Sequence, residues 1–392
     1  MEELYTLERE VGRGSYGVVF DGHMAKTGQR VAIKRLPCSN PECIELYLQE
    51  LWAMQATAKN HVNVIALHSC LLQTGPRSLK PLKPGRLPPR LVECVLKGRV
   101  VRAPQSQESS NTQSNIKERS VSRTDAVQAK SKLQERNKSN GLDSTTPQRP
   151  QKRARKRAAQ MEEERCLALW LVMEYCDGGD LNQYLLSRPP DSKRNHSVVQ
   201  QLCRAVDFLH SLGITHRDLK PDNVLVCVTP KGPVVKVADF GLSKMSDSVV
   251  DGDLSRQRFS STCGSDFYMA PEVWGGLTYT AQADIFSLGV MFWAVLERIT
   301  FVEEGATQEQ LGAYVCKSRL GWLMPLGEAL WENADLQLCI PMKFKRAPPL
   351  PPPPGPAMCA LLLDMLASDP DARPLAEQLE SRVRSALKED SN

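Results

Sequence analysis

The chain has 392 residues, a formal net charge of +5 at pH 7, and 12 cysteines without a Cys-x-x-Cys pair. This cysteine pattern excludes a disulfide framework or a zinc module and indicates buried thiols in a reducing compartment. The longest apolar run, 288–296, is shorter than the ~20 residues that a membrane span needs, and the acidic start of the chain is not a secretory signal. We therefore expect a soluble intracellular protein with no membrane partner.

The first predicted elements are two strands around a glycine-rich turn. Glycines allow backbone N–H groups to approach phosphates without interference from Cβ. The same pattern also opens dinucleotide-binding folds and ordinary turns, so it does not decide the fold. The turn and its flanks comprise Val11, Gly12, Arg13, Gly14, Ser15, Gly17 and Val19.

The next element is an apolar strand, Val31 to Lys34, that ends in a lysine. A dinucleotide-binding fold would place a helix here instead. The strand therefore favours Lys34 as the cation on the α- and β-phosphates of a nucleotide, the alternative being a solvated lysine at a strand end.

A helix is predicted over 42–59, because a cap and a first-turn proline precede a run without glycine. Lys34 needs a carboxylate partner on this helix, and Glu42, Glu45 and Glu50 are candidates. The first two lie near the helix start, where acids commonly complement the helix dipole. We select Glu50.

Two strands, 65–72 and 167–175, should be neighbours in one sheet, although a long segment separates them. Within that segment, 97–160 has no aromatic Phe, Tyr or Trp and carries 16 Lys/Arg against five Asp/Glu, a local charge of +11. Such a segment cannot bury enough apolar surface to offset its ordering entropy, so we predict disorder. Longer loops add little closure cost, so the sheet can tolerate this insert.

The insert contains a basic cluster, Lys-Arg-Ala-Arg-Lys-Arg at 152–157. Three interpretations compete: a signal for a nuclear import receptor, a contact with nucleic acid or another anionic surface, and solvated linker charge. Import is favoured because the segment is accessible. No aromatic residues are interleaved to stack bases, which argues against nucleic acid.

The strand that begins near Leu171 breaks into an acidic, glycine-containing turn at 176–180. This break indicates a hinge between two lobes, with a nucleotide base beside it. Backbone groups of Glu174 and Cys176 are predicted to bond the adenine, and Asp180 the ribose, although an acid there also suits a helix start. Side chains around the base would be Met173, Val19, Ala32 and Leu225.

The most informative stretch is His-Arg-Asp-Leu-Lys-Pro-Asp-Asn at 216–223, followed by Asp-Phe-Gly at 239–241. Phosphoryl transfer from ATP needs a group that accepts the hydroxyl proton, oxygen ligands for Mg²⁺ and a cation on the γ-phosphate. Asp218 is predicted to orient the hydroxyl, Lys220 to contact the phosphate, and Asn223 and Asp239 to hold the metal. This combination is the signature of a eukaryotic protein kinase, and Lys220 is typical of the serine/threonine branch.

A regulatory site is predicted in the segment that follows. Arg217 precedes the catalytic aspartate, and Ser261 and Thr262 are hydroxyls from which a phosphate would pair with this cation and order the segment. Ser265 is expected to be a structural hydroxyl near Asp218. The alternative is a segment that is always ordered.

Three further residues are predicted to support the site from the C-terminal half. Glu272, in Ala-Pro-Glu, should pair with Arg373. Asp284 starts an apolar helix and should accept backbone hydrogen bonds from the catalytic loop, which would fix Asp218 from beneath.

A proline-rich segment occupies 348–356. It is predicted to be exposed and to adopt the polyproline II conformation, because proline lacks the donor that a helix or central strand requires. Leu350 with its following prolines resembles a ligand for polyproline-binding adaptor domains, and Arg346 with Pro349 and Pro352 resembles an SH3 ligand. A rigid spacer is the alternative.

Several longer segments resemble the small subfamily of kinases named for interacting with PDZ-LIM proteins, whose members look largely nuclear. These segments are 13–19, 176–188, 236–244, 266–274 and 296–301. The resemblance covers roughly 5–75 and 165–388, but not the basic insert or the proline run.

The resemblance implies an α+β, two-lobed protein kinase fold. The β-rich N-lobe would be 1–175 including the hinge start, the mostly helical C-lobe 176–388, and the tail 389–392. It implies an ATP- and Mg-dependent enzyme that phosphorylates Ser or Thr of protein substrates. It also implies that the protein resides in the nucleus, with some in the cytoplasm. A kinase-shaped scaffold that displays the basic and proline segments is the alternative, but no catalytic position is degraded.

Overall fold

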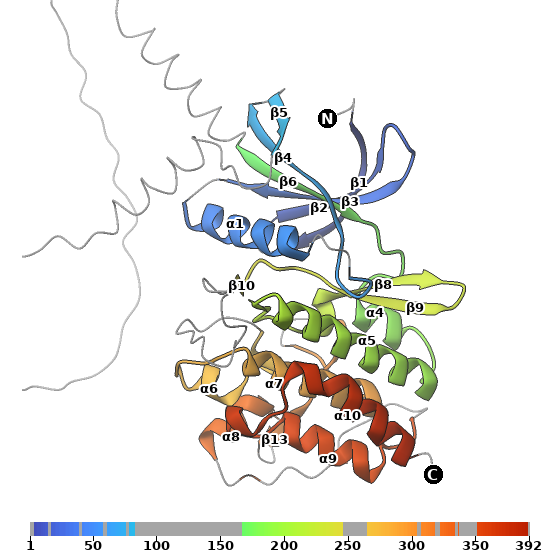
Figure 1. Cartoon of the computed structure of the whole chain (residues 1–392), viewed down its shortest axis with the longest axis vertical. Coiled ribbons are helices and arrows are strands. Elements are labelled where there is room, and N and C mark those ends of the chain that lie inside the picture. Colours follow the sequence, from blue (N-terminus) through green and yellow to red (C-terminus); the bar gives the residue numbers. More distant parts are fainter. Residues whose placement is uncertain are drawn as a thin grey trace, which may run out of the picture.

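The computed structural model of the chain describes residues 4–14, 17–38, 41–57, 61–75, 78–82, 167–245, 265–303, 307–317, 322–333, 336 and 351–390. The basic insert 97–160 with its cluster at 152–157, Ser15, Ser261 and Thr262 lie outside these ranges. Figure 1 shows a sheet and one helix above a mostly helical part, and the chain passes between them after β6.

The upper part is a six-stranded antiparallel sheet in the order β1-β2-β3-β6-β4-β5. Strand β6 lies between β3 and β4, although 86 residues separate the end of β5 at Pro81 from the start of β6 at Ala168. This confirms the predicted pairing of the two strands around the insert. The strands are β1 (Tyr5–Gly14), β2 (Gly17–Met24), β3 (Arg30–Pro37), β4 (Leu67–Gly75), β5 (Ser78–Pro81) and β6 (Ala168–Glu174).

The central strands of this sheet bury both faces. Along β6, Leu169 and Leu171 belong to the large core, whereas Ala168, Trp170 and Val172 pack on the opposite face with β3. This alternation follows from the two-residue period of a strand. Helix α1 (Pro41–Ala56) belongs to the large core and contacts β4 and β10. It ends before the predicted limit, and the Thr57 hydroxyl donates to the carbonyl of Met54.

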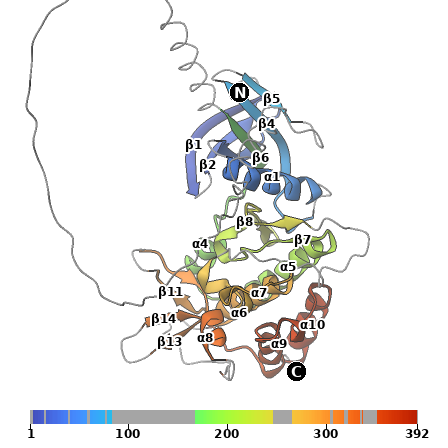
Figure 2. The ribbon, with the colours of Figure 1, turned by 90° about the vertical axis from the view of Figure 1, so that its left-hand side faces the viewer.

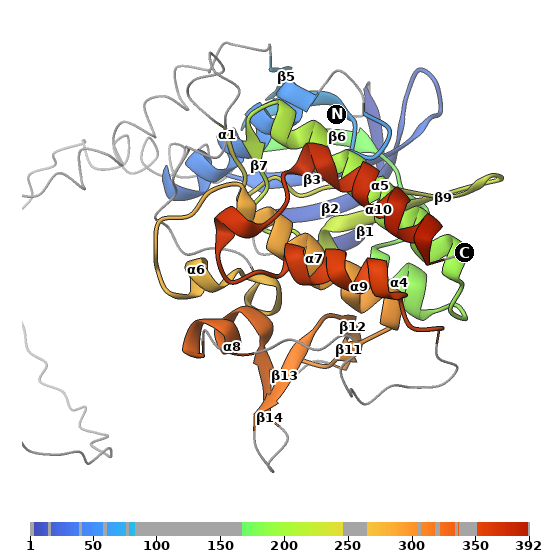
Figure 3. The same cartoon turned by 60° about the horizontal axis from the view of Figure 1, so that its bottom comes forward.

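The lower part is mostly helical (Figures 2 and 3). Its helices are α4 (Leu181–Leu186), α5 (Ser192–Ser211), α6 (Pro271–Trp274), α7 (Gln282–Glu297), α8 (Leu326–Glu332), α9 (Pro356–Met365) and α10 (Ala376–Glu389), with 3-10 turns η2 (Pro221–Asn223), η4 (Asp266–Tyr268) and η5 (Pro370–Ala372). Its strands are short: β7 (Ile214–Thr215), β8 (Val224–Thr229), β9 (Gly232–Val237), β10 (Lys244–Met245), β11 (Thr300–Phe301), β12 (Gln310–Leu311), β13 (Tyr314–Lys317) and β14 (Trp322–Pro325).

Helix α7 is the centre of this part, and all but one of its residues are buried. A helix that is apolar around its whole circumference must be enclosed by other elements. Helices α5 and α9 contact it, and α10 contacts α5 and α9 in turn. This rigid base carries the loops that form the candidate site. Among the described residues, no helix combines the length and apolar character needed to cross a membrane.

The end of the proline-rich segment differs from the prediction in two ways. Pro352 and Pro353 are exposed, but Pro351 is buried, so exposure is not uniform along the run. Pro356 begins helix α9. A proline is acceptable there because the first helical residues have no intrahelical acceptor for their N–H groups. Residues 348–350 lie outside the described ranges.

Candidate active site

A cleft of about 720 Å³ lies where the sheet meets the helical part, a size typical of small-molecule sites. The structure brings together here most of the residues predicted to bind nucleotide and metal. They are Val11, Gly12, Gly17, Val19, Ala32, Lys34, Glu50, Met173, Glu174, Cys176, Asp180, Asn223, Leu225 and Asp239. Arg13 does not line the cleft, because its guanidinium bonds both carboxylate oxygens of Glu10, 2.9 and 3.0 Å away.

The presence of glycine at two positions of the turn above the cleft has a different physical explanation at each position. A Cβ on Gly17 would lie 2.4 Å from the carbonyl oxygen of Arg35, so packing alone demands glycine there. A Cβ on Gly12 would meet nothing within 4 Å. Packing therefore does not explain Gly12, and the open space beside it suits the close approach of a phosphate to the backbone.

An ion-pair cluster forms the back of the cleft, in which Lys34 and Glu50 are buried and the Asp239 side chain is 45% exposed. The Lys34 ammonium lies 2.7 Å from Glu50 Oε1 and 3.2 Å from Asp239 Oδ1. Of the three candidate acids on the helix, Glu50 is thus the partner of Lys34. The other two, Glu42 and Glu45, have side chains outside the part of the chain that is described.

Burial and neighbouring charges set the ionisation of this cluster. Burial opposes the charged form of Lys34, but Glu50 and Asp239 outweigh it and raise the pKa of the ammonium. Burial likewise opposes ionisation of Asp239, yet the charge of Lys34 prevails and lowers the pKa of that carboxyl. The pKa of Glu50 is raised, because burial is only partly offset by Lys34. The cluster therefore keeps a cation fixed at the back of the cleft.

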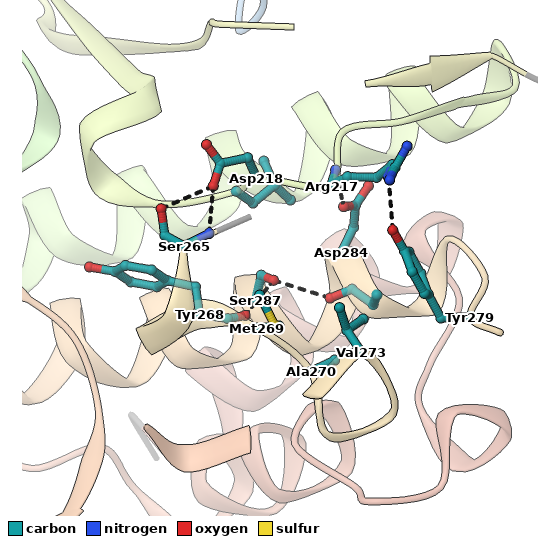
Figure 4. A pocket seen from close by; sticks show the side chains of 12 residues that line it. Arg217, Asp218, Ser265, Tyr268, Met269, Ala270, Val273, Tyr279, Asp284 and Ser287 are labelled. Carbon is teal, nitrogen blue, oxygen red and sulfur yellow. Dashed lines mark hydrogen bonds between the residues drawn. The ribbon is translucent and has the colours of Figure 1, made fainter. Parts of the chain in front are cut away.

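The Asp218 carboxylate has partners on both oxygens, and Figure 4 shows the contacts of one oxygen with Ser265. Its Oδ1 accepts from the backbone N–H and hydroxyl of Ser265 at 2.9 and 3.1 Å. Its Oδ2 accepts from Asn223 Nδ2 at 2.9 Å and lies 3.3 Å from Lys220 Nζ. Lys220 also donates to the Ser265 hydroxyl. Hydrogen bonds and one ion pair thereby fix the position of the carboxylate.

The backbone beneath Asp218 is fixed by Asp284 of helix α7, as the sequence predicts. The Asp284 carboxylate accepts from the N–H groups of His216 and Arg217, both at 2.8 Å, and lies 3.0 Å from His210 Nε2. Burial opposes its ionisation, but the contact with His210, together with the backbone bond from Arg217, lowers the pKa of the carboxyl. Arg217 has a φ of 70°, and such backbone persists in a non-glycine residue only where the surroundings enforce it.

His216 links the catalytic loop to the segment that carries Asp239. Its Nε2 donates to the carbonyl of Ala238 at 3.0 Å, while its Nδ1 accepts from the N–H of Asp218 at 3.3 Å. Asp239 itself has a positive φ of 59°. The two loops that bear the predicted catalytic and metal-binding acids are therefore joined through one buried imidazole.

The hinge runs alongside β8. Gly178 N–H donates to the carbonyl of Val226 at 2.7 Å, and a Cβ on Gly178 would lie 2.7 Å from that same oxygen, so only glycine fits. The Glu174 side chain accepts from the N–H of Ala66 at 2.7 Å and from Lys236 Nζ at 2.9 Å. Lys236 is a hinge support that sequence reasoning missed, because its partner is 62 residues away.

The donors at the cleft fit a magnesium ion. The two hydrogen bonds found for the Asp239 carboxylate both go to Oδ1, and the amide of Asn223 uses its Nδ2 to bond Asp218. One oxygen of each residue is thus left for other ligands in the cleft. Within the described residues no cluster of three or more His, Cys, Asp or Glu could hold a metal. Mg²⁺ suits such a sparse site, because it retains waters and binds through one or two protein oxygens plus substrate phosphates.

Sequence reasoning missed several other residues that line the cleft. Ile65 and Ala238 contribute apolar surface, and Gln183 contributes a polar group. Ala238 could have been found from its position immediately before Asp239. Ile65 carries no signal of its own, because an isoleucine at the start of a predicted strand is ordinarily a core residue.

Comparison with known families matches residues 157–382 to the protein kinase domain and residues 5–80 to protein tyrosine and serine/threonine kinases. The chain belongs to the protein kinase domain family, and its two-part architecture is the α+β, two-lobed fold of that family, with an N-lobe that carries the sheet and a helical C-lobe. The unmatched residues 81–156 begin at Pro81, the last residue of β5, and end before β6.

Several curated relatives are serine/threonine-protein kinases. The chain is 38% identical over 162 residues to serine/threonine-protein kinase unc-51 of Caenorhabditis elegans, covering 38% of this chain and 18% of the relative. It is 35% identical over 176 residues to ovarian-specific serine/threonine-protein kinase Lok of Drosophila melanogaster, covering 43% and 35%. It is also 35% identical over 176 residues to serine/threonine-protein kinase DCLK2 of Mus musculus, covering 44% and 22%. The chain thus spans only a minor part of these relatives' lengths.

Proposed function

We propose that the protein is an active kinase that transfers the γ-phosphate of ATP to serine or threonine residues of protein substrates. The observation that carries this proposal is the cluster of Lys34, Glu50 and Asp239 at the back of the cleft, with Asp218 held beside it. A scaffold would not need a buried cation and two acids in one cleft, with a positioned carboxylate bonded to Asn223, which also lines that cleft.

Each residue has one task in this proposal. Lys34, held by Glu50, binds the α- and β-phosphates, while the backbone at Gly12 approaches them from above. Asp218 orients the hydroxyl of the acceptor residue and accepts its proton, and Lys220 stabilises charge on the transferred group. Catalysis of this kind consists mainly of positioning and electrostatic stabilisation.

Asn223 and Asp239 are proposed to hold Mg²⁺, the metal that protein kinases generally use with ATP. When bound, the ion neutralises charge on the phosphate oxygens. Backbone groups of Glu174 and Cys176 bond the adenine, between Val19 and Ala32 above and Leu225 below.

A phosphorylation profile on a peptide array tests the proposal. Wild-type protein is expected to label Ser and Thr peptides, with little label on Tyr peptides. Lys34→Met should abolish labelling, and Arg382→Met, on the exposed face of α10, should leave it unchanged. Equal labelling by Lys34→Met and wild type, or no labelling by any preparation that binds Mg-ATP, would favour the scaffold alternative.

We also propose that phosphorylation of Ser261 or Thr262 switches the enzyme on. Arg217 supports this proposal by position, because its Nε donates to Tyr279 at 2.9 Å beside the catalytic loop, where an arriving phosphate would add a charge-assisted bond. Mass spectrometry of fully active protein is expected to find phosphate within 260–262. Full activity without phosphate there contradicts the switch.

The basic cluster at 152–157 is proposed to bind an import receptor and carry the protein into the nucleus, in line with the resemblance to the PDZ-LIM-interacting kinases. Replacing Arg153, Arg155, Lys156 and Arg157 with alanine should leave activity in vitro unchanged and move a fluorescent fusion to the cytoplasm. A mutant that stays nuclear contradicts import and makes the cluster a candidate for salt-dependent nucleic-acid binding.

The proline-rich segment is proposed as a ligand for an adaptor domain. The exposed Pro352 and Pro353 support this, whereas the burial of Pro351 narrows the surface that a partner can reach. Binding of SH3 domains to the full chain, compared with a Pro352→Ala and Pro353→Ala double variant, tests it. Equal binding by both proteins leaves the segment as a spacer.

A further inference from the structure

Two cysteine side chains from segments far apart in the sequence meet beside the nucleotide cleft. The Sγ atoms of Cys176 and Cys227 lie 3.0 Å apart. Cys176 is in the hinge and lines the cleft. Cys227 lies on β8, two residues after Leu225, which lines the cleft as well. A change at either sulfur therefore acts on a segment that shapes the cleft.

The backbone around the two cysteines holds these segments together. Val226 exchanges hydrogen bonds with the hinge, its carbonyl accepting from Gly178 at 2.7 Å and its N–H donating to Gly179 at 2.9 Å. The N–H of Val228 donates to the Asp177 carboxylate at 2.8 Å. These bonds flank both cysteines and hold the hinge beside β8. The contact between the thiols therefore depends on the positions of the two backbones as well as on the side-chain rotamers. A disulfide has an S–S length of about 2.05 Å, so a relative movement of about 1 Å would suffice to form one.

The pair is also accessible to a small oxidant. Among the six cysteines whose side chains are described, Cys38, Cys70 and Cys203 are buried, whereas Cys176, Cys227 and Cys359 are partly exposed. The expectation of uniformly buried thiols is therefore wrong for these three. Cys359 is on α9, and its thiol contacts the carbonyl of Pro354 at 3.5 Å.

The two thiols differ in how readily they ionise. The side-chain contact between the two thiols lowers the pKa of Cys227. The same contact, together with burial, raises the pKa of Cys176. Because the thiolate is the reactive form, Cys227 is the thiol that reacts first and Cys176 the one that follows.

We propose that Cys176 and Cys227 form an oxidisable dithiol site, which a peroxide converts to an intramolecular disulfide that weakens nucleotide binding. The Cys227 thiolate attacks one oxygen of hydrogen peroxide, which forms a sulfenic acid and releases hydroxide. Cys176 then attacks the sulfenic sulfur, forms the S–S bond and displaces the hydroxyl as water. Overall, two thiols and one peroxide give one disulfide and two waters, and a dithiol reductant reverses the oxidation.

The effect on nucleotide binding rests on the proposed function, whereas disulfide formation does not. The hinge at Cys176 and the strand at Leu225 enclose the proposed adenine position from two sides. Drawing these segments together displaces groups that bond and pack against the base. Hydrogen bonds and packing contacts weaken when their atoms move apart, so this displacement lowers the affinity for the nucleotide.

The first measurement is peptide mapping of the full chain after treatment with hydrogen peroxide and alkylation of the remaining thiols. Wild type and Cys359→Ser are expected to yield a cross-linked peptide pair that tandem mass spectrometry assigns to Cys176 and Cys227. Cys176→Ser and Cys227→Ser should lack it. If wild type keeps both cysteines alkylatable, or oxidises them separately to sulfinic acids, the proposal is overturned.

The second measurement is ADP binding by calorimetry, which requires no catalysis. Oxidised wild type is expected to bind ADP about tenfold more weakly than reduced wild type, with recovery after dithiothreitol. Cys227→Ser should show no redox dependence, and Cys359→Ser should behave as wild type. A disulfide that forms without changing ADP affinity refutes the coupling to the cleft, and an absence of ADP binding in reduced protein refutes the proposed function instead.

Discussion

The guanidinium of Arg373 forms two parallel hydrogen bonds with the carboxylate of Glu272, 2.7 and 2.8 Å long, across 101 residues of sequence. Both residues are buried. Arg373 also donates to the carbonyls of Ala367 and Gln282 at 2.9 and 3.0 Å. Glu272 lies in helix α6, and Arg373 follows the turn η5, which precedes helix α10. The pair therefore joins α6 to the start of α10.

Removing one partner of this pair should be strongly destabilising. Arg373→Met leaves the Glu272 carboxylate buried without its partner, and we expect a loss of about 3–5 kcal/mol in the free energy of unfolding. Urea denaturation measures this loss. The double variant Arg373→Met, Glu272→Leu should recover much of it, since no uncompensated charge remains.

A matched control is the exposed ion pair between Arg382 and Asp364, whose side chains are 40% and 49% exposed. Arg382→Met should cost less than about 1 kcal/mol. If Arg373→Met and Arg382→Met lose equal unfolding free energy, burial does not determine how much the Glu272–Arg373 pair contributes to stability.

The second prediction concerns pH. In Asp284→Asn the amide can accept from one backbone N–H but presents its NH₂ to the other donors, so we expect a loss of about 2–4 kcal/mol at pH 7. The pKa of Asp284 is lowered in the folded state. Its stabilisation is therefore complete above the ordinary carboxyl pKa, and is lost as pH falls through the lower, folded-state value.

Denaturation of wild type and Asp284→Asn between pH 7 and pH 3 checks this sign. The difference in unfolding free energy should be constant near neutrality and should narrow only below about pH 4. A difference that widens on acidification would be incompatible with a depressed pKa at Asp284.

The third prediction concerns the start of α9. The Asp390 carboxylate accepts from the N–H groups of Ala357 and Met358, both at 3.0 Å, and so caps the helix from the far end of α10. Asp390→Ala should cost about 1 kcal/mol, measured as a lower melting temperature. Glu389→Ala, an exposed acid next to it, should have almost no effect, and a comparable loss in both variants would exclude capping.

The fourth prediction separates the positioning of Asp218 from its chemistry. Ser265→Ala removes one of two bonds to Asp218 Oδ1, so kcat should fall by roughly ten- to hundredfold, less than for replacement of Asp218, the proposed general base. The KM for ATP should change little, because Ser265 does not line the nucleotide cleft. A rise in KM at constant kcat would place Ser265 in binding instead.

The sequence predicts the parts of the site that lie within short segments. The residue types of 216–223 and 239–241 suffice to propose Asp218, Asn223 and Asp239, and β6 is foreseen beside β4 because strand-like runs flank the insert. Contacts across long separations depend on tertiary packing. Periodicity cannot predict that Lys236 supports the hinge or that Cys176 meets Cys227. Local rules also fail at Pro351, where packing overrides the tendency of a proline run to stay exposed.

The central claim is that Lys34, Asp218 and Asp239 act as one phosphotransfer site, and Asp239→Asn tests it most directly. The amide keeps an oxygen for Lys34 and Gly241, so the fold should survive while the charge needed for Mg²⁺ is lost. Phosphotransfer to a Ser/Thr peptide and thermal stabilisation by Mg-ATP should be measured on both purified proteins. We predict equal melting temperatures without ligand, no stabilisation of Asp239→Asn by Mg-ATP, and phosphotransfer reduced by about three orders of magnitude or more. Equal phosphotransfer by the two proteins would contradict the account.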